Sequence, residues 1–253
     1  MPPSRIILGL DFDGTLAPIV LEPDGAAPDP QAVPLLSELS HCLQRVVIIS
    51  GRDTDFLLSR LPVTGALFIG NHGLEERDSG ASRVVDEAQP YLARLRRAAD
   101  AVEALPQARA RGIVIERKRA TLSIHFRQAA DPSASRAALQ PALEEIARRE
   151  HLQLQPGRLV WELRPPLELD KGEVLRRLAA DLQPAGIIYV GDDRTDSDAF
   201  SALKGMASVR TVAVGVRSTE VRADIFLDCD LMVDGVPGVT QLLRQVLDIC
   251  TGA

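Results

Sequence analysis

The chain has 253 residues, of which 45% are hydrophobic and 25% charged, a composition typical of a globular protein and not of a disordered one. Its formal net charge of -6 argues against nucleic-acid binding, which depends on a basic surface that meets the phosphates. Three widely separated cysteines, Cys42, Cys229 and Cys250, argue against a disulfide framework and predict reduced thiols in the cytoplasm.

The first predicted element is an apolar strand at residues 6–10, too short for a signal-peptide core or a membrane span, so no membrane association is expected. Asp11 follows directly, with Asp13 and Gly14 close behind. Open α/β sheets bind ligands at the carboxyl ends of their strands, and carboxylates are rarely buried without a cation or a proton. An EF-hand calcium loop is excluded because its glycine takes the sixth place after a helix, whereas Gly14 takes the fourth after a strand. A simple Asp-Gly turn remains an alternative.

Further apolar runs predict parallel strands at residues 45–49, 65–69, 186–190 and 211–214. Helices are expected between them, at residues 30–42, 53–61, 171–182 and 196–204. This alternation predicts the α/β class, with a doubly wound, Rossmann-like parallel sheet.

The second strand ends at Ser50, Gly51 and Arg52. A hydroxyl and backbone amides near a helix start can hold a phosphoryl oxygen, although a Ser-Gly pair by itself is more often only a helix entry.

The middle of the chain breaks the alternation and predicts an inserted α+β cap domain at 77–166, so that the core comprises 1–76 and 167–253. Strands at residues 113–116, 122–126, 152–155 and 159–163 alternate polar and apolar residues, as half-buried antiparallel strands do. A turn is expected at Pro156-Gly157, and helices are expected at residues 89–104 and 133–150.

Two later motifs carry unfavourable charges. Lys171 opens a helix, where a cation opposes the macrodipole, although a lone solvated lysine would need no explanation. After the strand at 186–190, Asp192, Asp193 and Asp196 repel one another unless a metal or a shared proton intervenes. Such oxygen ligands suit Mg2+.

Together these motifs resemble those of haloacid dehalogenase-type phosphohydrolases. The segments Asp11 to Val20, Gly70 to Glu75, Glu162 to Pro165 and Asp192 to Asp196 resemble trehalose-6-phosphate phosphatases more closely. The resemblance covers nearly the whole chain and is weakest in the cap helices.

The resemblance implies a role for each core residue. Asp11 would attack phosphorus and form an aspartyl-phosphate, while Asp13 would act as the acid and base. Mg2+ would be held by Asp11, the Asp13 backbone carbonyl and Asp192. Lys171 and Ser50 would hold the phosphoryl oxygens. Asp196 would orient either a metal-bound water or Lys171. Asp193 would lie near the metal without a defined role.

The resemblance also implies a set of substrate-binding residues. They are Gly51, Arg52, His72, Gly73, Lys118, His125, Arg127, Glu162 and Arg164. For the cap residues the alternative is a solvated sheet face. The basic run Arg117-Lys118-Arg119 leaves open which of the three faces the site.

The expected function is Mg2+-dependent hydrolysis of trehalose 6-phosphate, with a small-molecule sugar phosphate as the partner and a functional link to trehalose-phosphate synthase. Two alternatives stay open. One is a phosphatase for mannosyl-3-phosphoglycerate or sucrose 6-phosphate, because a fold cannot choose the substrate. The other is a non-catalytic sugar-phosphate sensor, against which the intact acidic motifs argue.

Overall fold

The computed structural model describes four stretches of the chain, residues 2–20, 25–157, 159–218 and 223–252. The chain divides into two compact units. Unit 1 comprises Met1–Arg83 with Leu169–Ala253, and unit 2 comprises Val84–Glu168. Unit 2 is therefore an insertion in the sequence of unit 1.

Unit 1 is built on a long sheet with the strand order β12-β11-β10-β1-β2-β3-β4-β5. Neighbours from β12 to β3 pair in parallel, and β3 pairs with β4 in the antiparallel sense. The bounds are β1 (Ile6–Leu10), β2 (Arg45–Ile49), β3 (Leu67–Gly70), β4 (Glu75–Arg77), β5 (Arg83–Val84), β10 (Gly186–Gly191), β11 (Arg210–Arg217) and β12 (Leu231–Asp234). The central strands are buried on both faces because they are aliphatic throughout.

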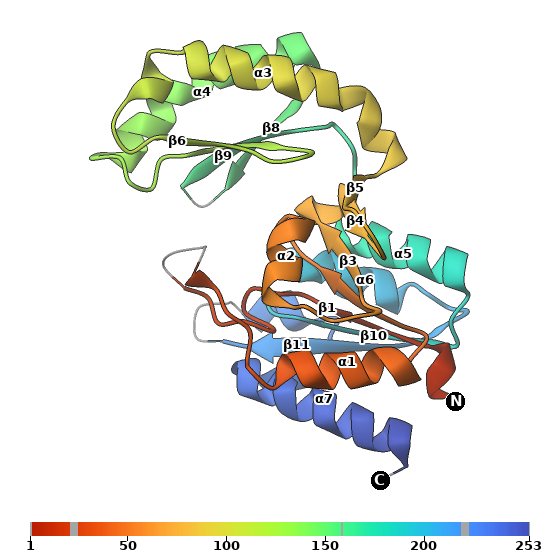
Figure 1. The fold of residues 1–253 in the computed structure, drawn as a ribbon. Helices are drawn as coiled ribbons and strands as arrows, with labels where there is room; N and C mark the ends of the chain where they lie inside the picture. Colours follow the sequence, from red (N-terminus) through yellow and green to blue (C-terminus); the bar gives the residue numbers. More distant parts are fainter. Residues whose placement is uncertain (1, 21–24, 158, 219–222, 253) are drawn as a thin grey trace. The chain divides into compact units, whose positions relative to one another are not determined.

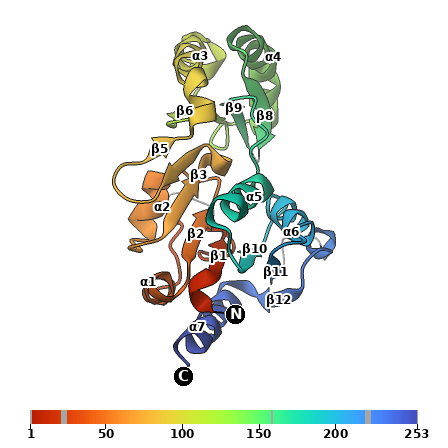
Figure 2. The ribbon, with the colours of Figure 1, turned by 90° about the vertical axis from the view of Figure 1, so that its right-hand side faces the viewer.

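Helices cover both faces of this sheet, and Figure 2 shows the layers. They are α1 (Ala32–Cys42), α2 (Thr54–Arg60), α5 (Lys171–Leu182), α6 (Asp196–Lys204) and α7 (Gly235–Thr251). Apolar side chains of α1, α2 and α7 pack with one sheet face, and those of α5 and α6 with the other. Short 3-10 turns of unit 1 lie at Pro3–Arg5, Asn71–Gly73 and Ala223–Phe226, and those of unit 2 lie at Asp86–Tyr91 and Gln107–Arg109. None of the described helices is long and apolar enough to cross a membrane.

The predicted α/β fold class is confirmed, and β4, β5, β12 and α7 add to the predicted elements. The first turn of α7 holds Gly235, Pro237 and Gly238, which are poor residues for a helix interior. Proline is tolerated in a first helical turn, where its missing N–H would have no intrahelical partner anyway. The apolar residues that follow pack against α1 and the sheet.

Unit 2 contains a four-stranded antiparallel sheet with the order β6-β7-β9-β8. Its elements are α3 (Leu92–Ala104), β6 (Val114–Arg117), β7 (Leu122–His125), α4 (Pro132–Glu150), β8 (Gln153–Gly157) and β9 (Val160–Arg164). Figure 1 shows α3 and α4 side by side. Both helices share one apolar core with Leu122, Ile124 and Trp161 of the sheet, so the polar residues that alternate with these occupy the other sheet face.

The turn predicted at Pro156-Gly157 is wrong, because β8 continues through both residues. Pro156 is paired with Trp161 and Gly157 with Val160. Proline cannot donate a hydrogen bond to a neighbouring strand, but β8 lies at the sheet edge, where no donation is needed on its outer side.

Candidate active site

Three adjacent strands of unit 1 deliver the predicted core residues. β1 pairs in parallel with β10 on one side and with β2 on the other, as Figure 2 shows. Asp11 follows β1, Ser50 follows β2 and Asp192 follows β10. Parallel neighbours end at the same sheet edge, so residues far apart in the sequence meet there.

Lys171, the first residue of α5, contacts two carboxylates at this sheet edge. Its side chain is buried, and Nζ lies 2.9 Å from Asp11 Oδ1 and 2.7 Å from Asp196 Oδ1. Burial alone would lower the pKa of Lys171, but the charges of Asp11 and Asp196 outweigh it and raise the pKa. The ammonium group therefore stays charged at the sheet edge, which explains a cation at a helix start.

Asp196 is the most heavily bonded carboxylate of the site. Oδ1 accepts from Lys171 Nζ and, at 2.6 Å, from the Tyr189 hydroxyl. Oδ2 accepts from the backbone amides of Asp192 and Asp193, each at 2.9 Å. Burial raises the pKa of Asp196, although Lys171 opposes the rise. Asp196 thus fixes both the lysine and the loop after β10.

Tyr189 was not among the predicted site residues. It is fully buried in β10, and burial together with the charge of Asp196 raises the pKa of its hydroxyl. A Cβ on Gly9, its partner in β1, would come 2.8 Å from the Tyr189 ring, so only glycine leaves room for it. The signal in the sequence was a hydroxyl-bearing residue inside an otherwise aliphatic strand.

Asp11, Asp192 and Asp196 form a group that could hold a metal ion, with one oxygen of each within 4.8 Å of the others. Asp192 Oδ1 accepts from the Thr15 hydroxyl at 3.2 Å, whereas Asp192 Oδ2 is buried and has no hydrogen-bond partner among the described residues. An all-oxygen donor set with a buried unpartnered oxygen suits a hard divalent cation.

Gly14 contributes to the same space. Its φ is +83°, and a Cβ there would come 2.1 Å from Asp192 Oδ2. The left-handed backbone and the close approach both require glycine at this position. The loop after β1 thereby reaches the carboxylate of Asp192.

Mutual repulsion marks the acidic group. Burial, then Asp196 and Asp193, raise the pKa of Asp192 to about 7. Burial also raises the pKa of Asp11 well above its usual value, with Lys171 opposing and the neighbouring carboxylates adding. The pKa of Asp193 is lowered, because Lys171 and hydrogen bonds from Thr195 outweigh its burial. A cation would relieve this repulsion.

The carboxylate of Asp13 forms a bidentate ion pair with Arg52. Nε of Arg52 donates to Oδ2 at 2.7 Å and Nη2 to Oδ1 at 2.8 Å. The guanidinium also lies over the Phe56 ring, and the backbone amide of Arg52 donates to Ser50 Oγ at 3.2 Å. Two of the predicted residues thus contact each other.

The loop between β3 and β4 carries His72 to the end of β2. A Cβ on Gly51 would come 2.7 Å from His72 Nε2, so the glycine makes room for the imidazole. Asn71 and His72 both have left-handed backbones, with φ of 48° and 55°. Such strain persists only where the surroundings impose it.

Glu75 is the residue that holds this loop, and it was not predicted as a site residue. Its carboxylate is fully buried, accepting from Asn71 Nδ2 at 2.6 Å and from Thr54 Oγ1 at 3.2 Å. It therefore ties the loop to the start of α2. A glutamate at the first position of a strand was the available signal, but its partners could not be read from spacing.

The predicted residues of unit 2 lie mainly on its polar sheet face. Lys118 Nζ lies 3.8 Å from Glu162 Oε1, and the Ser123 hydroxyl donates to the same oxygen at 3.2 Å. His125 Nε2 lies 2.9 Å from Glu116 Oε2. This face therefore presents both charges and hydrogen-bonding groups.

Arg164 and Arg127 have different surroundings. Arg164 is buried and donates to Gln155 Oε1 at 3.3 Å, and burial lowers its pKa against the opposing charge of Glu162. Arg127 is exposed beyond the end of β7. The same set of predicted residues thus contains one buried and one solvent-facing guanidinium.

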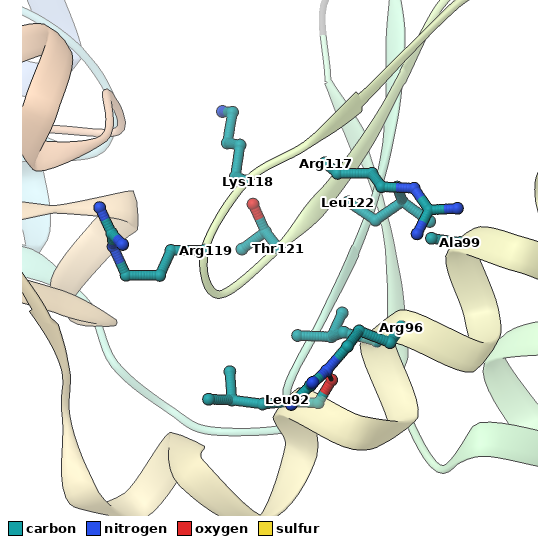
Figure 3. Close-up of a pocket in the computed structure, with 9 residues that line it drawn as sticks. Leu92, Arg96, Ala99, Arg117, Lys118, Arg119, Thr121 and Leu122 are labelled. Atoms are coloured by element: carbon teal, nitrogen blue, oxygen red, sulfur yellow. Dashed lines mark hydrogen bonds between the residues drawn. The ribbon is translucent and has the colours of Figure 1, made fainter.

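The structure shows where Arg117, the last residue of β6, and Lys118, the residue after it, are directed (Figure 3). Arg117 forms ion pairs with Asp100 and Glu103 of α3, whereas Lys118 pairs with Glu162 of the sheet. Arg117 therefore lies on the helix side, and Lys118 on the polar face.

Comparisons with known proteins identify the family of the chain. The trehalose-phosphatase family model matches residues 9–230. A trehalose-phosphate phosphatase of Mycolicibacterium paratuberculosis is 36% identical over 221 residues, covering 83% of this chain and 54% of that protein. A trehalose 6-phosphate phosphatase of Zea mays is 31% identical over 248 residues, covering 88% of this chain and 66% of that protein. The chain thus spans about half the length of the first of these.

Among solved structures, that of a trehalose-6-phosphate phosphatase related protein aligns with a TM-score of 0.79 at 23% identity. The alignment covers 97% of this chain and 99% of that one. At this identity the likeness establishes the fold alone.

Proposed function

Because the chain belongs to the trehalose-phosphatase family, we propose that it hydrolyses trehalose 6-phosphate to trehalose and inorganic phosphate. The observation that carries the proposal is the buried contact of Lys171 with both Asp11 and Asp196, beside the unpartnered oxygen of Asp192. A cation and several carboxylates concentrated at one sheet edge suit the transfer of an anionic group.

Asp11 is the proposed nucleophile. A carboxylate oxygen forms a bond to phosphorus as the bond from phosphorus to the sugar oxygen breaks, giving an aspartyl-phosphate that water then cleaves. Lys171, 2.9 Å from Asp11 Oδ1, favours the ionised carboxylate against the effect of burial. Lys171 and Ser50, which is also buried, would hold the phosphoryl oxygens.

Asp13 is the proposed acid and base. It protonates the departing sugar oxygen and later takes a proton from the attacking water. The bidentate ion pair holds its carboxylate on Arg52. A substrate phosphate would compete for that guanidinium, so Arg52 would bind the phosphate and release Asp13. The proton that Asp13 takes from water in the second step is the one that it gives to the sugar oxygen in the next turnover.

Mg2+ is the proposed metal, held by Asp11, Asp192 and the backbone carbonyl of Asp13. The unpartnered Asp192 Oδ2 supports this assignment. Both oxygens of Asp196 already accept two hydrogen bonds each, so Asp196 is better suited to orienting Lys171 than to binding a metal. When bound, Mg2+ would neutralise negative charge on the phosphate and lower the barrier to attack by an anion.

Sugar recognition is assigned to the inserted domain at 77–166, acting as a cap, together with the His72-Gly73 loop of unit 1. The polar sheet face offers a cation, carboxylates and an imidazole, in Lys118, Glu162 and His125. Such mixed donors and acceptors suit the many hydroxyls of a disaccharide. Arg164 and Arg127 complete the proposed set.

A cytoplasmic reaction is the proposed setting, because the three cysteines are free thiols. The substrate chemistry implies a functional link to a trehalose-phosphate synthase, since a phosphatase needs an enzyme that supplies its phosphate ester.

The test is phosphate release from a panel of sugar phosphates with Mg2+. Asp11→Asn should abolish release while circular dichroism and melting temperature show an intact fold. The matched control Asp181→Asn alters an exposed carboxyl of α5 and should leave turnover unchanged. Near-normal turnover in Asp11→Asn would remove Asp11 as the nucleophile. A clear preference for sucrose 6-phosphate or mannosyl-3-phosphoglycerate would change the substrate but keep the chemistry.

A further inference from the structure

Two of the three cysteines meet at the ends of neighbouring helices of unit 1. Cys42 is the last residue of α1, and Cys250 lies in the last turn of α7. The two helices pack against each other on one face of the sheet (Figure 1), and both cysteines belong to the apolar cluster that these helices share. The fold thus brings together two thiols that lie 208 positions apart in the sequence.

The two thiols are joined by a hydrogen bond. The Cys42 thiol donates to the backbone carbonyl of Glu38, with Sγ 3.3 Å from the oxygen, which leaves the lone pairs of its sulfur for a second donor. The Cys250 thiol is hydrogen-bonded to Cys42. The two side chains therefore point toward each other, as a disulfide requires. Both cysteines are only partly buried, so an oxidant as small as hydrogen peroxide can reach them.

The third cysteine has different surroundings. Cys229 packs with the apolar cluster on the opposite sheet face, where burial and the charge of Asp230 raise the pKa of its thiol to about 12. Burial and then the Cys42 thiol raise the pKa of Cys250 to about 11. Because the thiolate is the reactive form, both of these thiols are largely unreactive at neutral pH. Cys250 therefore differs from Cys229 in having a thiol neighbour, and not in its acidity.

The cysteine pair lies at the end of the sheet that is remote from the acidic group. α1 ends at Cys42 and leads into β2, which begins at Arg45, whereas Ser50 follows the opposite end of that strand. A bond between the two cysteines would join α1 to α7 without contacting the carboxylates that follow β1 and β10.

We propose that Cys42 and Cys250 form a site of reversible oxidation, at which hydrogen peroxide converts the two thiols into a disulfide that joins α1 to α7. One sulfur, as the thiolate, attacks a peroxide oxygen; the O–O bond breaks, giving a sulfenic acid and a hydroxide that takes up the released proton as water. The second sulfur attacks the sulfenic sulfur; the S–S bond forms, the S–O bond breaks, and the oxygen leaves as water with the proton of the second thiol. The two thiols lose two electrons and two protons, and the peroxide becomes two water molecules.

The expected consequence is a more stable protein under oxidising conditions. The disulfide would connect residues 208 positions apart, and a cross-link over a long loop restricts the unfolded chain strongly. Disulfides in a reducing compartment are usually transient, so a dithiol reductant would restore the two thiols. The proposal does not rest on the proposed function, because neither its chemistry nor its readouts involve a sugar phosphate.

The test oxidises the full chain with hydrogen peroxide in the absence of substrate. The intact mass should fall by the mass of two hydrogen atoms, and trypsin should release residues 6–45 linked to residues 245–253. The melting temperature should rise by about 5–15 °C, as a disulfide that closes a long loop in a domain of this size produces. Dithiothreitol should reverse both changes.

Three serine variants locate the effect. Cys42→Ser and Cys250→Ser should each abolish the linked peptides and the rise in melting temperature, whereas the matched control Cys229→Ser should keep both. Circular dichroism checks that each variant is folded. The masses of the parent protein decide whether the bond forms, even where a variant fails to fold.

The proposal is overturned if the parent only gains oxygen, as sulfinic or sulfonic acid, without losing two hydrogen atoms. It is also overturned if the linked peptides contain Cys229, or if non-reducing gel electrophoresis shows that the disulfide joins two copies of the chain. An unchanged melting temperature after complete formation of the bond would overturn its role in stabilising the packing of α1 with α7.

Discussion

Lys171 of unit 1 and Lys118 of unit 2 both pair with carboxylates, but in different environments. The Lys171 and Asp196 side chains are 3% and 0% exposed and lie 2.7 Å apart. The Lys118 and Glu162 side chains are 15% and 17% exposed and lie 3.8 Å apart. The first pair belongs to a network with a tyrosine and two backbone amides, and the second shares only a serine hydroxyl in the described contacts.

Under the proposed function, this difference corresponds to two tasks. Buried, multiply bonded groups hold one geometry, which suits a reaction that proceeds in the same way on every substrate. Partly exposed and loosely paired groups can exchange their partners for a ligand at low cost, which suits recognition. We therefore expect changes in the first network to affect kcat and stability, and changes in the second to affect KM.

The largest effect is expected from Lys171→Met. Removing the cation leaves Asp11 and Asp196 as buried, unneutralised carboxylates, which should cost about 3–5 kcal/mol of unfolding free energy. The loss in kcat should be on the order of 10²–10³ or greater. Urea unfolding and phosphate release measure both quantities.

Lys204→Met is the matched control, because Lys204 forms an exposed ion pair with Asp228. If Lys171→Met and Lys204→Met had the same free energy of unfolding, the buried contacts of Lys171 would not stabilise unit 1 more than an exposed ion pair does.

The next effect is on metal binding as a function of pH. Burial and neighbouring acids raise the pKa of Asp192 to about 7, and a metal binds only the deprotonated carboxylate. Below pH 7 a proton must be displaced, so affinity for Mg2+ should fall about tenfold for each pH unit, whereas above pH 7 it should level off. Calorimetric titration between pH 5.5 and 8.5 measures this. Constant affinity across that range would contradict the assignment of Asp192 as a ligand.

A smaller effect is expected from Glu162→Gln in unit 2. Loss of the charge beside Lys118 should raise KM for trehalose 6-phosphate about tenfold and leave kcat nearly unchanged, because uniform binding is weakened. Steady-state kinetics give both constants, with Glu144→Gln on the exposed side of α4 as the control. A fall in kcat at constant KM would place Glu162 with the reacting groups instead.

The smallest effect is expected from Arg117→Gln. Arg117 is 44% exposed and pairs with exposed carboxylates of α3, so its removal should change stability little, because exposed ion pairs contribute little. KM should not change, whereas Lys118→Gln, one position along on the opposite face, should raise it. Equal KM values in the two variants would mean that the polar face does not select the substrate.

The sheet of unit 1 was predictable because each buried strand is a continuous aliphatic run that stops at a polar motif. Asp11, Ser50 and Asp192 could be brought together from this pattern alone, since parallel strands share an edge. The contacts of Tyr189 and Glu75 could not, because they depend on which side chains meet across different elements. The position of Tyr189 in its strand does not reveal whether its side chain only packs in the core or also donates a hydrogen bond to Asp196.

Unit 2 was harder to predict in its details. Alternation identified its strands, but it did not fix which of Arg117 and Lys118 faces the helices, since both are basic. Strand pairing settles that question. Pro156 and Gly157 carry a strong turn signal that was overridden by the position of β8 at the sheet edge, which no local pattern reveals.

The close approach of Gly14 to Asp192 also limits how this protein can be recombined. The two residues lie 178 positions apart, and a Cβ on the first would fall 2.1 Å from the carboxylate of the second. A chimera that takes its opening segment from one relative and its closing segment from another must therefore inherit a matched pair of loops. Directed evolution of a new substrate range would then keep both loops as one inherited block and draw its variation from unit 2.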